Sequence, residues 1–414
     1  MTASRWHWVG LSGALGLIGV ATLVPYPEQA ELSRSTPLGC LVCGELGGVD
    51  VLLNLALFVP LGIALRMLGL RVLPSIVVAF ATSLLVEMAQ ATVVAGRDPS
   101  LSDLLTNSAG GLLGAVLGGH LTSLWRPGPA LAARLALAAA GGWLMLLAGT
   151  AWAVRPAATL GPGRAEWAPR LPLLDTFAGR IEAVDVKGTI PARDLSMLAT
   201  ARLDGWTDHL APAVDLVGPR GTMTARLGQL GQKVTFGVRA NATRLRLRPP
   251  SVKVYRALPP ASGQQVQLAG GLRDATIWAR AEAEGSVHSA ELALTPGLGW
   301  LLLLPLTFYP FDYRPDLTTA AWVALPLLFA GFWAGRRWAW HVRMGAAGAI
   351  ATNGAGAVAL LVLGLVVVPE LFGVAADGWR CWAAGAAALG GGWLAGRYAP
   401  GAASTRDPPS ARSA

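Results

Sequence analysis

The sequence predicts a membrane α-helical bundle of about eight spans with an inserted extracytoplasmic all-β sandwich. Of its 414 residues, 53% are hydrophobic and only 14% are charged, which is typical of a membrane protein rather than a soluble domain. Long apolar runs recur in both halves of the chain, whereas the middle part is polar and punctuated by turns. We therefore divide the chain into a five-helix membrane domain (1–154), a β-sandwich (155–297), an interfacial segment with three further helices (298–398) and a disordered cytoplasmic tail (399–414).

The long apolar runs of the sequence predict the positions of the membrane-spanning helices. Most of them reach the roughly 17–25 residues that a membrane helix needs. They lie at 8–24, 51–70, 73–94, 104–125, 131–154, 318–334, 345–368 and 379–394. A ninth run, Leu298–Phe308, is too short to span, and prolines and aromatic residues cluster at its end, so we expect it to lie at the membrane interface. Arginines gather on one side of the spans, which predicts that both termini are cytoplasmic.

Between residues 155 and 297 the apolar period changes to two. Val234–Val238, Leu245–Leu247, Ala275–Ala279 and Ala290–Leu294 alternate in this way. Glycine- and proline-rich turns separate such stretches, which is typical of a sandwich of short antiparallel strands. Since this part follows the fifth span, the arginine pattern places it outside, with both of its ends at the membrane surface.

A set of polar residues interrupts the first apolar half, where such groups are costly and normally mark a functional site. The set is Asp50, Asn54, Ser83, Glu87, Gln90, Arg97, Asp103 and Asn107. Helical spacing and depth along the spans predict that three helices bring these groups to one layer in the outer half of the membrane. Arg97 lies in the loop above, where it would pair with Glu87 or Asp103.

The same stripe of the fourth span continues with Gly110, Gly114 and Gly118. Small residues at this spacing allow the backbone of a neighbouring helix to approach closely. We therefore expect this stripe to be a helix-packing seam.

Structural interpretations compete with a functional one. Asn, Gln and Ser in membrane helices often only join helices, and Asp50 and Asp103 both fit the pattern of a helix N-cap. For Asp103, a cap and a site fit equally. Glu87 lies in mid-helix with no Lys or Arg within one turn, which favours a functional or network role over a chance buried acid.

Other site classes find little support. Cys40 and Cys43 lie in a segment predicted to be outside, where a disulfide clip fits better than a redox site, and no second ligand pair follows them to complete a zinc site. We expect no metal and no cofactor. The net charge of +9 comes from arginines beside apolar runs, without interleaved aromatic residues, so we expect membrane lipids rather than nucleic acid as partners.

The stretch from Asp50 to Gly118 resembles the VanZ-like membrane domain. The resemblance rests on Asp50–Gly62, Ser83–Gln90 and Arg97–Gly114, taken in this order and spacing. It implies a multi-pass protein of the bacterial inner (cytoplasmic) membrane, in a family named for resistance to the glycopeptide antibiotic teicoplanin.

The middle part is similar to the concanavalin A/laminin-G-like sandwich that occurs as an insertion in some VanZ-like proteins. Phe177–Gly179 and Leu227–Phe236 carry this second resemblance. It implies an extracytoplasmic domain that binds a glycan or another envelope protein.

Three functions follow, and the oligomeric state is left open. In the first, the polar layer binds an envelope lipid head or a glycan-linked ligand on the outer side, with Arg97 contacting an anionic group. In the second, the protein is an intramembrane enzyme acting on a lipid-linked envelope precursor, with Glu87 as general base and Asp103 as its partner or as a cation ligand. In the third, it is a structural scaffold. The cluster offers no nucleophile besides Ser83, which favours binding over catalysis.

Overall fold

The computed structural model describes residues 5–25, 42, 44–94, 97, 99–157, 163–172, 174–188, 194–219, 221–259, 262–304, 315–343 and 349–399. Cys40, Cys43 and the predicted tail from residue 400 onward lie outside this part of the chain, so the disulfide and the tail stay predictions. The chain divides into two compact units. One takes residues 1–141, 324–357 and 386–414, and the other takes residues 142–323 and 358–385.

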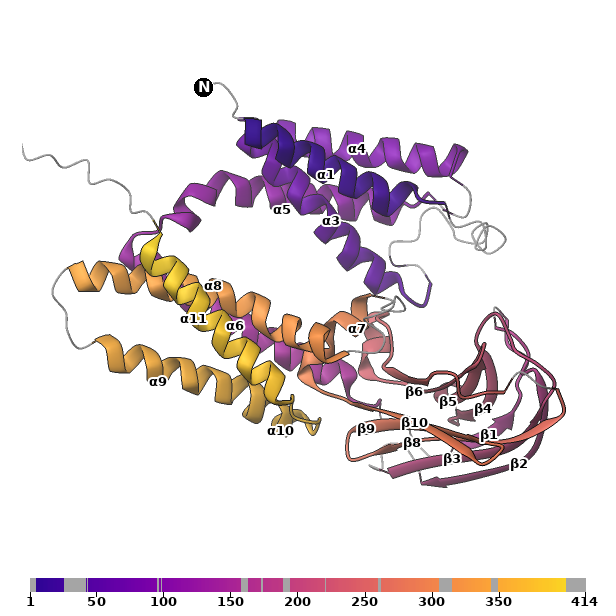
Figure 1. Ribbon diagram of the computed structural model, residues 1–414. Helices are drawn as coiled ribbons and strands as arrows, with labels where there is room; N and C mark the ends of the chain where they lie inside the picture. The colour runs from indigo at the N-terminus through magenta and orange to yellow at the C-terminus, as the bar shows by residue number, and fades with distance from the viewer. Residues whose placement is uncertain are drawn as a thin grey trace, which may run out of the picture. The chain divides into compact units, whose positions relative to one another are not determined.

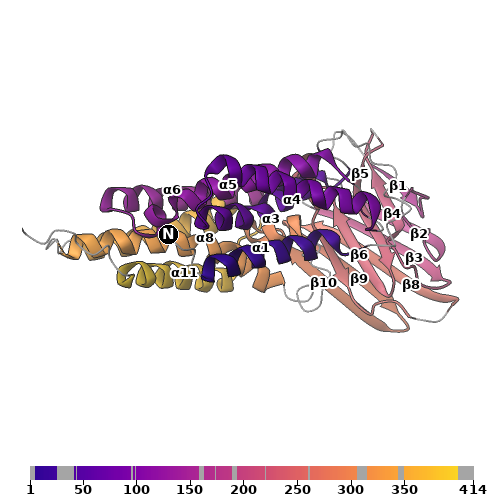
Figure 2. The ribbon, with the colours of Figure 1, turned by 90° about the horizontal axis from the view of Figure 1, so that it is seen from above.

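The first unit begins with a bundle of apolar helices that lie side by side (Figures 1 and 2). These are α1 (Arg5–Leu23), α3 (Gly47–Met67), α4 (Val72–Thr92) and α5 (Leu101–Trp125). Their shared core includes Phe58, Leu61 and Ala79, which are all 0% exposed. Many outward side chains are apolar as well, which is the pattern of helices that face lipid.

Glycines bring α3 and α5 into backbone contact. A Cβ placed on Gly114 would lie 2.9 Å from the carbonyl carbon of Val59, and one on Gly110 would lie 3.0 Å from that of Leu55. A Cβ on Gly118 would lie 3.1 Å from the Cα of Ile63. All three distances are too short for a side chain, so this seam depends on the absence of one.

The remaining helices are α6 (Pro129–Val154), α7 (Gly299–Leu303), α8 (Pro315–Arg343), α9 (Ala349–Val362), α10 (Val368–Phe372) and α11 (Trp379–Tyr398). A π-helical turn at Leu363–Val367 joins α9 to α10. Six stretches of the described residues are long and apolar enough to cross a membrane. They are Arg5–Leu23, Gly47–Met67, Val72–Thr92, Pro129–Val154, Asp316–Trp340 and Gly354–Phe372. The chain is therefore a multi-pass membrane protein.

The predicted count of eight spans also includes α5 and α11. Both form as helices, of 25 and 20 residues, but neither is among the six apolar stretches. Small and polar residues in both sequences lower their hydropathy, so their assignment as spans stays a prediction.

Part of α11 packs against α8 through a second glycine seam within the first unit. A Cβ on Gly335 would lie 2.9 Å from the carbonyl carbon of Trp393, and one on Gly396 would lie 2.9 Å from that of Phe332. Glycine therefore stands on both helices at this crossing.

The second unit contains two antiparallel five-stranded sheets (Figure 1). One runs in the order β1 (Arg164–Trp167), β4 (Ala211–Val217), β5 (Met223–Leu230), β6 (Lys233–Val238), β7 (Ser251–Val254). The other runs in the order β10 (Ser286–Ala293), β9 (Thr276–Ala283), β8 (Gln264–Arg273), β3 (Asp194–Leu203), β2 (Gly179–Gly188). We call the second one the β10–β2 sheet.

Three of the four period-two stretches coincide with strands of these sheets. The stretches at 234–238, 275–279 and 290–294 fall within or overlap β6, β9 and β10. The expectation for Leu245–Leu247 is wrong, because Asn241–Leu245 is a 3-10 helix and Arg246 adopts a left-handed conformation at φ 53°.

The inner faces of the sheets bury alternate residues. Along β3, Leu195, Met197 and Ala199 are at most 2% exposed, whereas Leu198 between them is 37% exposed. From the other sheet, the ring of Phe236 fills the space above Gly270, where a Cβ would lie 2.5 Å from Cδ2. A large side chain of one sheet is thus matched by a glycine of the other.

Backbone hydrogen bonds fix the β part to the end of α6. The amide of Ala157 donates to the Arg239 carbonyl at 2.8 Å, and the amide of Asn241 donates to the Arg155 carbonyl at 3.0 Å. Asn241 Nδ2 also donates to the carbonyl oxygen of Trp152 at 3.1 Å. The β part therefore continues directly from a membrane helix.

The chain leaves the sheets through a 3-10 turn, Pro296–Leu298, and α7. The amide of Arg248 donates to the carbonyl of Leu302 in α7 at 3.1 Å. These residues cover the start of the segment predicted to be interfacial, whereas residues 305–314 lie outside the described part.

Candidate functional site

The polar residues of the first half join neighbouring helices in pairs. Asn54 Nδ2, on α3, donates to Asp103 Oδ1, on α5, at 2.8 Å. Asp50 lies one turn before Asn54 on α3, and its charge acts on the Asp103 carboxyl. Asp103 is thus held by one neutral donor and repelled by one like charge.

A second pair joins α5 to α4 at greater depth. Asn107 Nδ2 donates to Ser83 Oγ at 3.0 Å. The two residues are 1% and 0% exposed. Because polar groups so deeply buried are costly unless they bond to each other, this pair fixes how α4 and α5 face one another.

Glu87 meets the beginning of α5. Its Oε2 accepts a 2.7 Å hydrogen bond from the backbone amide of Ser100. Ser100 is the N-cap of α5, and its own hydroxyl accepts from the amide of Ser102 at 3.1 Å. The carboxylate therefore binds at a helix start, where free amides and the helix dipole favour negative charge.

These contacts correct the cap interpretation of the two aspartates. The N-cap of α5 is Ser100, and the residue at the N-cap of α3 is Leu46. Asp103 and Asp50 instead lie in the first turns of their helices. Both carboxylates gain from the helix dipole there, but neither closes the helix end.

Gln90 connects the cluster to α1. Its Nε2 donates to the carbonyl oxygen of Thr22 at 2.9 Å. Because a carbonyl oxygen can only accept, this contact fixes Oε1 as the opposite, acceptor end of the amide. Oε1 is buried and has no hydrogen-bond partner among the described residues.

Arg97 lies at the carboxyl end of α1. Its Nη2 donates to the carbonyl of Ala21 at 3.0 Å, and its Nε donates to the carbonyl of Val24 at 3.5 Å. These bonds neutralise carbonyl groups that a helix end leaves free. The guanidinium also acts on the Asp103 carboxyl through its charge.

The structure thus brings the predicted polar residues to adjoining positions on α3, α4, α5 and the preceding loop, and adds partners that sequence reasoning missed. Thr22 and Ser100 act through backbone atoms, so neither has a side-chain signal for this role. A Ser-x-Ser-Asp run at 100–103 does indicate a helix start.

Carboxyl groups gather at this end of the bundle. Asp50 acts on Asp103, and Asp103 acts on Glu87. Among the described residues no group of three or more His, Cys, Asp and Glu side chains has a geometry that could hold a metal ion. The arrangement can accept hydrogen bonds and attract positive charge.

Comparison with known families supports the first resemblance. Residues 8–121 match the family model described as VanZ/LLP1. The match starts in α1, ends in α5 and includes all eight polar residues, so this region of the chain is VanZ-like. No curated protein and no solved structure matches the chain.

Proposed function

We propose that the polar cluster of α1, α3, α4 and α5 binds the head group of a bacterial envelope lipid, and that this head group carries hydrogen-bond donors such as an ammonium. In this proposal the protein lies in the inner membrane with both termini in the cytoplasm and its β part outside. The arginines beside the spans support this orientation. The cluster then faces the outer leaflet, which contains lipid-linked precursors of the cell envelope and other lipids.

The buried amide oxygen of Gln90 is the observation that carries the proposal. Gln90 is 8% exposed, and its Oε1 has no partner among the described residues. A buried acceptor without a donor costs about 1–3 kcal/mol. A ligand that donates a hydrogen bond at this position would remove that cost.

Charge supports a donor-bearing ligand. Asp50 acts on the Asp103 carboxyl and Asp103 acts on that of Glu87, whereas Arg97 directs hydrogen bonds to the end of α1. These contacts favour a cationic head group over the anionic one that we expected from sequence. Repulsion among the carboxylates would decrease when a cation binds.

The same contacts favour binding over catalysis. Ser83, the one candidate nucleophile that we named, is 0% exposed and bonded to Asn107. Glu87 is engaged at the start of α5. An intramembrane enzyme with Glu87 as general base is therefore the weaker hypothesis.

The β part and the link to antibiotics remain part of the proposal. We propose that the two sheets form a concanavalin A/laminin-G-like sandwich outside the membrane. We also propose that occupancy of the cluster affects tolerance of teicoplanin-type glycopeptides, since such antibiotics act on the cell envelope.

Native mass spectrometry of the purified chain tests the lipid proposal. Wild type should retain a defined amine-bearing lipid, and Asp103→Asn should lose it while keeping the oxygen that Asn54 contacts. Thr82→Ala is the matched control, because Thr82 is a partly exposed residue of α4 whose hydroxyl donates to the Val78 carbonyl of its own helix. Equal retention of the same lipids by all three proteins would refute the proposal.

Glu87→Gln separates the enzyme from the binding protein. A binding protein should keep partial retention, because Gln can still accept from the Ser100 amide. An enzyme should instead accumulate unprocessed substrate lipid on the variant, detected in the same spectra.

A further inference from the structure

One face of the β10–β2 sheet is hollowed. The hollow has a volume of about 470 Å³ and is lined from strands β3, β8, β9 and β10. Leu198 and Gln267 line it, and both alternate along their strands with fully buried residues, so the hollow lies on the face turned away from the sheet core. Side chains from four adjacent strands therefore share one exposed surface.

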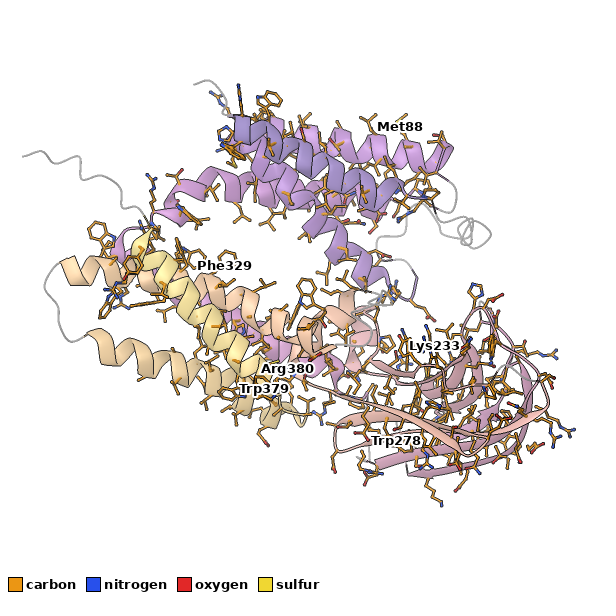
Figure 3. The ribbon with its side chains drawn as sticks, in the orientation of Figure 1. Met88, Lys233, Trp278, Phe329, Trp379 and Arg380 are labelled. Carbon is orange, nitrogen blue, oxygen red and sulfur yellow. The ribbon has the colours of Figure 1, made fainter. Side chains whose placement is uncertain are left out.

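This face holds an indole ring laid over a glycine. Trp278 of β9 pairs directly with Gly271 of β8. A Cβ on Gly271 would lie 2.7 Å from Cζ2 and 2.8 Å from Cε2 of the indole. A larger residue at 271 would push the ring away, so the glycine allows Trp278 to cover the neighbouring strand. Figure 3 labels Trp278 in this part of the chain.

Polar side chains with planar ends lie beside the ring and farther along the same face. Glu291 of β10 pairs with Trp278 on its other side. Arg280 and Glu282 of β9 form an ion pair with a 2.7 Å contact, and both stay substantially exposed, with side chains at 50% and 41%. Gln267 stands opposite Glu282 on β8. Donors and acceptors are thus presented next to the aromatic platform and along the same face of the sheet.

The charges of the hollow balance. Its lining contains two arginines, Arg273 and Arg280, and two glutamates, Glu282 and Glu291. A net charge near zero gives no electrostatic reason to select an anion or a cation. Paired donors and acceptors instead suit hydroxyl groups, which both donate and accept.

A pyranose sugar has the matching chemistry. Its ring presents a face of C–H groups, which packs on the electron-rich face of an indole, and a rim of hydroxyls. The width of several strands suits a chain of sugars rather than a single one. An apolar ligand would leave the surrounding charged and amide groups without partners.

We propose that this hollow is a binding site for a neutral oligosaccharide, with Trp278 as the stacking platform and Arg280, Glu282, Glu291 and Gln267 as hydrogen-bonding groups. The site lies within the second unit and does not depend on lipid binding by the polar cluster. The outward orientation proposed above would expose it to glycans of the cell envelope.

Calorimetric titration of the full chain tests this site, using cellotetraose, chitotetraose and maltotetraose as probes. The protein must be held in a detergent without a sugar head, since a maltoside would compete. Wild type should bind at least one of the three with a dissociation constant at or below the millimolar range. Trp278→Ala should weaken that binding at least about fivefold, in line with the loss of an aromatic stacking contact.

Two further variants test whether a loss of binding is specific to this site. Trp167→Ala removes another exposed tryptophan, which is 51% exposed on β1 of the other sheet, and should bind like wild type. Glu291→Gln changes a surface group without removing the platform and should weaken binding several-fold even if Trp278→Ala fails to fold.

Several results would contradict the proposed oligosaccharide site. They are the absence of binding of all three probes, equal losses in the Trp167 and Trp278 variants, or unchanged binding in both the Trp278 and Glu291 variants. A heparin tetrasaccharide that binds while the neutral probes do not would also reject it, because it would show selection for anions.

Discussion

The Nδ2 atom of Asn54 donates a 2.8 Å hydrogen bond to the Asp103 carboxylate, joining α3 to α5 across 49 residues of sequence. The bond lies at the same helix interface as the glycine seam, where the backbones approach too closely for larger side chains. The seam brings the two helices together, and the Asn54–Asp103 bond adds a charge-assisted contact that fixes their relative position. The polar cluster thus has a structural role that any functional test must separate from ligand binding.

A double-mutant cycle on this pair should measure the contact directly. Asn54→Leu and Asp103→Leu should each lower the unfolding temperature in detergent, and the double variant should lose less than the sum. We expect a coupling free energy of about 1–2 kcal/mol, because one partner is charged. Additive losses would mean that the bond contributes nothing to stability.

Alanine at position 114 should separate α3 from α5. A Cβ there would lie 2.9 Å from the Val59 carbonyl carbon, so Gly114→Ala should destabilise by roughly 1–3 kcal/mol. Gly16→Ala on α1 is the matched control, since nothing lies within 4 Å of its Cβ position. That change should be neutral or stabilising, because alanine favours helices. Thermal unfolding of both variants measures the difference. Equal changes in unfolding temperature would contradict close packing at the seam.

Asp377 should make stability depend on pH. It precedes α11, is 5% exposed, and its Oδ1 accepts a 3.2 Å hydrogen bond from the Gly297 amide. Burial raises the pKa of its carboxyl above the ordinary value of 3.8, and the Thr295 side chain and the Gly297 amide offset part of that rise. Since the folded state holds the proton more tightly, this group costs stability as pH rises from 3.8 through the raised folded pKa.

Asp377→Asn removes that cost and can still accept from the Gly297 amide. The variant should unfold at a higher temperature than wild type at pH 7, and the difference should shrink as the pH falls toward the unfolded pKa of 3.8. Glu370→Gln provides a control, because it removes a carboxyl from nearby α10. A difference between Asp377→Asn and wild type that stays constant with pH would contradict this assignment.

The β part offers a buried ion pair to compare with an exposed one. Arg226 Nε and Nη2 bond both oxygens of Asp215 at 2.8 and 2.7 Å, with side chains only 16% and 3% exposed. Arg226→Ala leaves the Asp215 carboxylate buried without its partner. It should therefore lower the free energy of unfolding by about 3–5 kcal/mol. Denaturant unfolding measures this loss.

The exposed pair Arg280–Glu282 provides the contrast. Its side chains are 50% and 41% exposed. Arg280→Ala should therefore lower the free energy of unfolding by at most about 1 kcal/mol. Similar losses in the Arg226 and Arg280 variants would mean that burial does not decide the strength of these pairs.

The apolar runs of the sequence predict that a helix is present more reliably than they predict where it begins and ends. Residue 51 begins the second apolar run, but α3 begins earlier, at Gly47, and α8 extends to Arg343, beyond the apolar run that ends at residue 334. Hydropathy reports which part of a helix meets lipid, whereas backbone hydrogen bonds continue into polar flanks. The wrong strand at 245–247 has a similar cause, since two leucines around an arginine also fit a short 3-10 turn.

The polar cluster was predictable as a stripe but not as a set of bonds. Helical spacing alone places Ser83, Glu87 and Gln90 on one side of α4. It cannot reveal that Gln90 bonds a backbone carbonyl of α1, because that partner has no side-chain signature. Arg97 shows the same limit. Its charge acts on Asp103, one of the two carboxylates that the sequence offered, but its hydrogen bonds to carbonyls of α1 have no side-chain signature.

The sequence by itself determined the membrane helices, the polar middle part, the VanZ-like segment and the glycine stripe of α5, because each is a local pattern of hydropathy, spacing or motif. Tertiary structure alone decided which atoms of the cluster meet, that Ser100 rather than Asp103 caps α5, and that Trp278 covers Gly271 on the next strand. Those outcomes depend on helix approach and strand register between residues far apart in the chain. Such distances are set by packing, which no local pattern records.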